Sequence, residues 1–119
     1  MDGKSKPRIL VKGAGVAGLT AAVTLAERGG AVTLYDRGGR VGAGASWMAG
    51  GMLAPWCEAE SAPAEVTAQS ADSVAWWKVH VPGVTCNGSL VLAPARDVGE
   101  LARFGRRTSH FEQVGADAI

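Results

Sequence analysis

The short glycine-rich segment at residues 13–18, with the sequence GAGVAG, constrains the fold of this chain more than any other feature. It follows the apolar run Ile9–Val11 and opens a stretch rich in Ala and Leu, a pattern that predicts a strand turning sharply into a helix. Gly13 permits the tight turn, Gly15 allows a ligand to approach the backbone, and Gly18 lets the helix lie close to the strand. Because the first N–H groups of a helix have no partners within it, the helix start attracts a pyrophosphate.

The flanking sequence completes a β-α-β unit. We expect strands at residues 8–12 and 31–35 in a parallel sheet, joined by a helix over residues 16–28. Asp36 ends the second strand, where a carboxylate can accept hydrogen bonds from a ribose 2′-OH. The pattern therefore predicts a Rossmann-like unit that binds an adenine dinucleotide. The apolar face of the helix is expected at Val16, Leu19, Val23 and Ala26.

The spacing after the glycines indicates which dinucleotide is bound. Ala22 and Gly29 extend the pattern to GxGxxG-xxx-A-xxxxxx-G, which is typical of FAD-binding β-α-β units. A small residue at 22 lets the helix cross the sheet closely, and Gly29 ends the helix so that the second strand can return. Asp36 argues against NADP, because a carboxylate would repel the 2′-phosphate. An NAD-dependent dehydrogenase fragment ranks last, since a long loop follows Asp36 instead of a third strand.

The remainder of the chain predicts less regular structure. Eleven of the 17 glycines lie between Gly13 and Gly51, which indicates either close backbone approach to a ligand or a flexible loop. We expect a loop at 37–51 interrupted at 45–49, a helix over 66–79, and strands at 84–87 and 89–93. A further helix is expected from the cap Asp97 to residue 107, with Glu100 completing a capping box. Since two parallel strands are too few for a stable doubly wound sheet, we expect the N-terminal part of a longer protein.

Composition excludes several classes of partner. The net charge is +1 and the basic residues are scattered, which argues against nucleic acid. No apolar run approaches the roughly 20 residues that span a bilayer, and the polar N-terminus does not resemble a signal peptide. Cys57, Cys86, His80 and His110 show no metal-ligand spacing, so no metal is expected and the thiols are expected to be reduced. These features predict a cytoplasmic protein.

A second motif points to a family. Residues 42–55 read GAGASWMAGGMLAP and are followed by the acidic segment CEAE at 57–60, while Pro82–Leu92 contains an Asn-Gly-Ser-Leu turn. Together with residues 13–36, these segments resemble the D-amino-acid oxidase superfamily, within its branch of glycine oxidases of thiamine biosynthesis and sarcosine oxidases. The resemblance spans nearly all of the chain but only about the first third of such an enzyme.

The resemblance implies an FAD-dependent oxidase of a small amino acid or secondary amine, with glycine as the first choice. Such an enzyme removes a hydride from the substrate α-carbon to give an imine, and O2 becomes H2O2. The fold implied is an FAD-binding part at residues 1–80 and the start of an antiparallel substrate domain at 81–119. The arginine and tyrosine that bind substrate in this family lie beyond such a segment, so the 119 residues alone are expected to be inactive. Family members are often oligomeric, and the sequence leaves the oligomeric state open.

The resemblance also assigns cofactor roles. The amides of Val16 and Ala17 would face the pyrophosphate, while Asp36 and Arg37 would contact the ribose and adenosine. The loop at Gly44–Ser46 would lie along the phosphates and ribityl chain, and the segment Gly50–Met52 would pass the isoalloxazine. The cofactor-binding set is therefore Gly13, Gly15, Val16, Ala17, Gly18, Asp36, Arg37, Gly44, Ala45, Ser46, Gly50, Gly51 and Met52.

Other residues of interest receive plainer interpretations. Trp76 and Trp77 are expected to pack in a core or an interface. Trp56, just after the proposed flavin segment, is open between packing and a role near the flavin. His80 and His110 are expected to be structural or exposed. A different class of function stays open: a non-catalytic nucleotide-binding module, or the small subunit of a heteromeric flavoenzyme.

Overall fold

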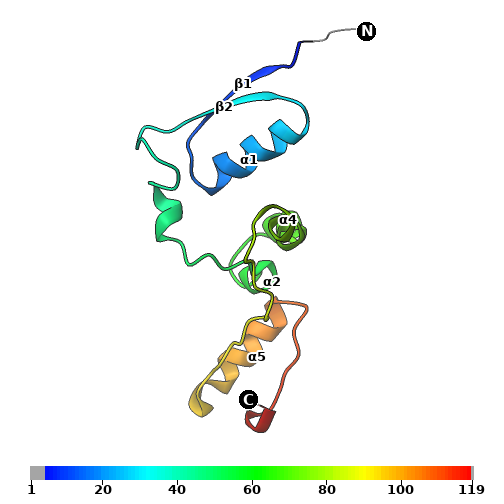
Figure 1. The fold of residues 1–119 in the computed structure, drawn as a ribbon. Helices are drawn as coiled ribbons and strands as arrows, with labels where there is room; N and C mark the ends of the chain where they lie inside the picture. Colours follow the sequence, from blue (N-terminus) through cyan, green and yellow to red (C-terminus); the bar gives the residue numbers. More distant parts are fainter. Residues whose placement is uncertain (1–4, 119) are drawn as a thin grey trace. The chain divides into compact units, whose positions relative to one another are not determined.

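The computed structural model describes residues 5–118 as a mixed α/β chain of two compact units, which divide between Met52 and Leu53 (Figure 1). The first unit contains β1 (Arg8–Lys12), α1 (Val16–Glu27), β2 (Ala31–Tyr35) and the 3-10 helix η1 (Ala45–Met48). The second contains α2 (Pro55–Glu58), α3 (Ala64–Ser70), α4 (Ser73–His80), η2 (Ala95–Asp97), α5 (Val98–Arg107) and η3 (Ala116–Ala118).

The first unit is a β-α-β unit with a parallel strand pair. β1 and β2 pair from Arg8 opposite Ala31 to Lys12 opposite Tyr35, which confirms the predicted strands residue by residue. α1 ends one residue before the predicted limit and lies along one side of the pair (Figure 1). The strands alternate between half-buried and exposed side chains, as expected when a helix covers one face. The half-buried positions are Ile9, Val11, Val32 and Leu34.

The packing face of α1 was predicted only in part. Leu19 is half-buried as expected, but Val16 and Val23 are exposed. The closest approach instead involves Gly18, where an added Cβ would overlap the carbonyl oxygen of Gly13 and lie 3.6 Å from a methyl group of Val11. The lack of a side chain at Gly18 lets the helix backbone come this close. This glycine therefore sets the helix–strand contact, and the predicted row of aliphatic side chains does not.

The second unit contains helices where the sequence predicts one long helix. The predicted helix over 66–79 is two helices, α3 and α4, which are separated at Ala71 and Asp72. Ser70 donates its hydroxyl proton to the carbonyl oxygen of Val66 at 2.7 Å, and such side-chain bonds compete with helix continuation. The short helix α2 was not predicted. Across residues 5–118, every helix is too short or too polar to traverse a lipid bilayer.

Two other expectations for this unit were wrong. Residues 84–87 and 89–93 form no strands, and Leu90 and Leu92 are 59% and 69% exposed. An isolated two-stranded hairpin is marginal in water, and no strand pairs with it within the described residues. α5 forms nearly as predicted, but Asp97 makes no side-chain cap bond. Asp97 and Glu100 pair instead with neighbouring arginines, Arg96 and Arg103.

The contact at Gly18 generates a stability prediction. Gly18→Ala is expected to lower the free energy of unfolding by about 1–3 kcal/mol, because the new methyl group must displace backbone atoms. Gly99→Ala on α5 is the matched control, since a Cβ there meets no atom within 4 Å and alanine favours a helix by about 0.5 kcal/mol. Urea unfolding of both variants measures the difference. A Gly18→Ala protein as stable as the parent would contradict the close helix–strand contact.

Candidate functional site

The turn between β1 and α1 is shaped by its two leading glycines. Gly13 has a positive φ of 103° and donates its N–H to the carbonyl oxygen of Tyr35 at 2.7 Å. Gly15 is the N-cap of α1 and accepts the N–H of Leu19 at 2.9 Å. The N–H groups of Val16, Ala17 and Gly18 therefore belong to the first turn of the helix, where no helical carbonyl precedes them. The family resemblance assigns the amides of Val16 and Ala17 to a pyrophosphate.

Asp36 joins the end of β2 to this turn. One carboxylate oxygen accepts the N–H of Ala14 at 2.7 Å and the other accepts the N–H of Gly38 at 2.7 Å. The hydrogen bond from Ala14, then that from Gly38, hold the pKa of Asp36 below its ordinary value, and the nearby charge of Arg37 adds to the effect. Partial desolvation opposes these contributions without reversing them. Asp36 is therefore ionised, with lone pairs still available to a hydroxyl donor.

Ser46 reaches the same turn from a position 30 residues after Val16. Its Oγ accepts the N–H of Val16 at 2.9 Å. A Cβ placed on Gly15 would lie 2.9 Å from this Oγ, so glycine at position 15 makes room for a protein side chain as well as for a ligand. The hydroxyl group keeps one proton to donate. Ser46 thus acts as a distant cap on α1 and can still hydrogen-bond a phosphate oxygen.

One contributor lies outside the predicted set. Gly42 donates its N–H to the carbonyl oxygen of Ala14 at 2.9 Å and has a positive φ of 71°. With the bonds of Asp36 and Ser46, this contact folds the loop after β2 back onto the glycine turn. Only the residue type, glycine, could have pointed to this contact in the sequence, because every residue except proline carries a backbone N–H.

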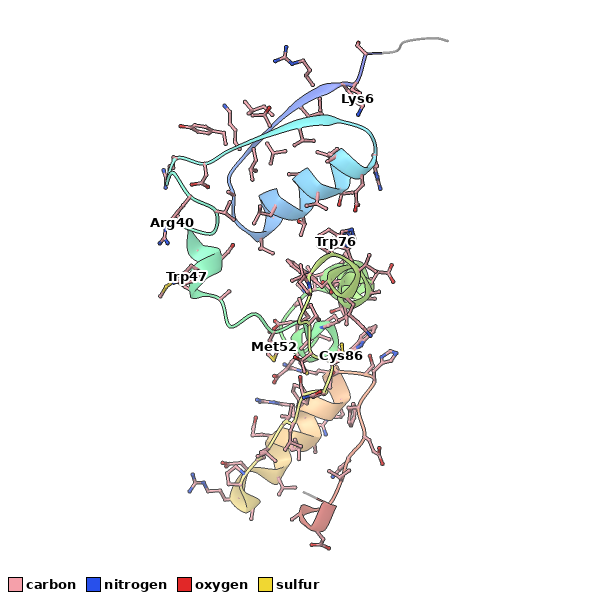
Figure 2. The ribbon with its side chains drawn as sticks, in the orientation of Figure 1. Lys6, Arg40, Trp47, Met52, Trp76 and Cys86 are labelled. Atoms are coloured by element: carbon pink, nitrogen blue, oxygen red, sulfur yellow. The ribbon has the colours of Figure 1, made fainter. Side chains whose placement is uncertain are left out.

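The other predicted site residues follow along the loop. Gly44 is the N-cap of η1 and accepts the N–H of Trp47 at 3.1 Å, while Ala45 and Ser46 begin that helix. Arg37 is exposed. Gly50, Gly51 and Met52 are also exposed, and no hydrogen bond within residues 5–118 joins them to the turn. Figure 2 shows Trp47 and Met52 on this stretch of chain, with exposed fractions of 74% and 69%.

The donor set and the open space suit a diphosphate group. Added Cβ atoms at Gly13 and Gly44 would meet nothing within 4 Å, so the backbone here is accessible. The first-turn amides of α1 and the Ser46 hydroxyl supply hydrogen-bond donors, and the helix start carries a partial positive charge. Asp36, at the carboxyl end of β2, supplies acceptors for ribose hydroxyl groups. The residues present therefore fit the phosphate and ribose portion of a dinucleotide.

Contacts in the second unit agree with packing roles for its paired tryptophans. Trp76 and Trp77 form an edge-on pair with ring centroids 5.2 Å apart. Trp76 also stacks on His80 at 3.9 Å.

The geometry of Ser46 and Gly15 predicts a coupled pair of substitutions. Ser46→Ala is expected to cost about 1 kcal/mol in unfolding free energy, because the Val16 N–H loses its cap. Gly15→Ala is expected to cost less in the Ser46→Ala background than in the parent, because the new Cβ then has no Oγ to displace. Denaturant unfolding of the four proteins without added cofactor measures the coupling. Strict additivity of the two costs would refute the contact.

The hydrogen bonds to Asp36 predict a pH dependence. Since its pKa is lowered in the folded chain, the carboxylate contributes stability that is complete above the ordinary value of 3.8 and is lost as pH falls through the lower folded value. Carboxyl-carbon NMR titration of the folded protein is expected to give Asp36 a pKa below 3.8. A native pKa at or above 3.8 would show that the N–H groups of Ala14 and Gly38 do not hold the carboxylate.

Comparisons with known proteins support this interpretation. The family model described as FAD dependent oxidoreductase (DAO) matches residues 8–118. A protein of Rhizobium etli named "Putative thiamine biosynthesis oxidoreductase ThiO" is 56% identical over 122 aligned residues. That alignment covers 94% of this chain and 35% of the relative, so the chain spans about a third of the relative's length. No solved structure matches the chain.

The family match covers both the glycine turn and the loop that folds back onto it, as well as the helices of the second unit. It confirms the resemblance drawn from the motifs at residues 13–36 and 42–55. Asp36 and Ser46 bring hydrogen-bonding groups to the glycine turn that suit the phosphates and ribose of a dinucleotide such as FAD. The chain belongs to the DAO family of FAD-dependent oxidoreductases, and the cofactor of this family is FAD.

Proposed function

We propose that this chain supplies the phosphate- and ribose-binding part of an oxidase that acts on a small amino acid or secondary amine, with glycine as the first substrate to test. The observation that carries the proposal is the convergence of Asp36 and Ser46 on one glycine turn, at 2.7 and 2.9 Å from the N–H groups of Ala14 and Val16. The identity to the Rhizobium etli protein supports the choice of substrate class, because its name places that protein in thiamine biosynthesis.

In this proposal the backbone of the glycine turn and the loop after β2 bind different parts of the cofactor. Ala17 and Gly18 donate N–H groups to the pyrophosphate, and the Val16 amide acts through the Ser46 hydroxyl that it already bonds. Asp36 accepts the ribose hydroxyl protons, and Arg37 lies near the adenosine. Gly44 and Ala45 lie along the phosphates, and the segment Gly50, Gly51 and Met52 lies beside the isoalloxazine ring.

When bound, the flavin would supply the redox chemistry: it would take a hydride from the substrate α-carbon, and its two electrons would pass to O2 with two protons to give H2O2. The residues named above bind and orient the cofactor and do not touch the substrate. The substrate-binding arginine and tyrosine implied by the family are proposed to lie outside the 119 residues. The domain limits at 1–80 and 81–119 and a cytoplasmic location stay predictions.

Flavin reconstitution of the full-length protein tests the proposal. We expect a yellow protein that absorbs at about 450 nm and releases peroxide with at least one of glycine, sarcosine or D-proline. The 119-residue chain alone is expected to release none. Absence of flavin absorbance after reconstitution would reject the cofactor assignment, whereas bound flavin without peroxide release from any of the three amines would reject the substrate class.

Substitution of Asp36 tests its role in this site. Asp36→Asn is expected to weaken FAD binding about tenfold, because the amide cannot accept hydrogen bonds at both positions as a carboxylate does. Asp72→Asn is the matched control, since Asp72 is exposed and makes no side-chain cap bond on α4. Titration of the flavin-free protein with FAD gives both dissociation constants. Equal constants for the two variants would remove Asp36 from the proposed site.

A further inference from the structure

Two Trp–His stacks occur among the described residues, and they differ in what they join. Trp76 and His80 lie one turn apart on α4, so their stack joins two residues of the same helix. Trp56 on α2 stacks on His110, with ring centroids 3.9 Å apart and planes inclined by 18°. The second stack therefore links the start of the second unit to the segment that follows α5.

A hydrogen bond strengthens the same link. The hydroxyl group of Thr108 donates to the carbonyl oxygen of Trp56 at 2.5 Å, across a separation of 52 residues. Arg107 adds a longer bond of 3.5 Å to the carbonyl oxygen of Glu60. The turn that begins at Trp56 is thus held by its side chain and by its backbone at once. We call Thr108–His110 the clasp.

The backbone of the clasp is held in an unfavourable conformation. His110 has φ of 59°, and it is the single non-glycine residue with a positive φ among those that the structure describes. Residues in such regions of backbone space persist where their surroundings fix them, and they cluster at functional sites. In this conformation the His110 ring stacks on Trp56. His110 Nδ1 lies 3.0 Å from Ser109 Oγ, within hydrogen-bond distance.

We propose that Thr108 and His110 are positioning residues for Trp56. By fixing Trp56 at the start of α2, the clasp anchors the chain where it leaves the segment Gly50–Met52. Because that segment is assigned to the isoalloxazine, this inference rests on the proposed function. The clasp then determines how firmly the flavin segment is held at its downstream end, although neither residue touches the cofactor.

Three variants and one control test the clasp in the full-length protein. Thr108→Val removes the hydroxyl donor at nearly constant shape, and Thr108→Ser restores it. His110→Asn keeps a residue that tolerates positive φ but removes the stacked ring. His80→Asn removes the other Trp–His stack, which lies within α4. Hydrogen exchange of the amides at 57–62 is measured without flavin, and the FAD dissociation constant and the circular dichroism of bound flavin are measured with it.

Thr108→Val and His110→Asn are expected to speed amide exchange at 57–62 and to weaken FAD binding, each about fivefold, as for loss of one hydrogen bond. The flavin dichroism should change in both variants, while Thr108→Ser and His80→Asn should match the parent. Unchanged exchange in Thr108→Val and His110→Asn would overturn the clasp itself. Faster exchange with an unchanged FAD constant and flavin spectrum would overturn its positioning role alone. A parent protein that binds no FAD would reject the proposed function, and the positioning role with it.

Discussion

The N–H groups at the start of α1 set the main physical constraint on the first unit. A helix start leaves donors without helical partners, and a structure that buries or orders them must supply acceptors. Here Ser46 accepts the N–H of Val16, the first residue of α1, and Asp36 accepts the N–H of Ala14 in the turn before it. Both acceptors come from beyond β2, so the glycine turn can be completed only after the second strand and its loop have folded back. The contacts that complete the local fold are therefore also those that shape the proposed binding site.

The hydrophobic core contributes little to this arrangement. Ala14 is the one fully buried apolar side chain of the first unit among the residues that the structure describes. One face of the strand pair is covered by α1, while Leu10 and Tyr35 on the other face are 57% and 58% exposed. Parallel sheets are ordinarily covered on both faces. The close backbone packing at Gly18 and the hydrogen bonds of Asp36 and Ser46 to the turn therefore stabilise much of this unit.

The sequence predicted the β-α-β unit well because its signals are local. The apolar runs Ile9–Val11 and Ala31–Tyr35 marked the two strands, and the glycine pattern marked the turn between β1 and α1. Features that depend on distant contacts were missed or wrong. Strands at 84–93, for example, require a partner strand. The capping box at Asp97 failed for a local reason, because Arg96 and Arg103 pair with the two carboxylates. The contact of Gly42 with Ala14 and the stack of His110 on Trp56 join residues with no spacing that sequence patterns could recognise.

The tethers of the loop after β2 also bear on the length of that loop. Gly42 bonds the carbonyl oxygen of Ala14, and Ser46 bonds the N–H of Val16 two residues further along the turn. The stretch between Gly42 and Ser46 thus spans two fixed points. An inserted residue there would pull one tether away from its partner. Residues 39–41 also lie between two tethers, because Asp36 and Gly42 both bond the backbone of Ala14. The number of residues from Asp36 to Ser46 is therefore constrained along the whole loop by contacts with residues 14–16.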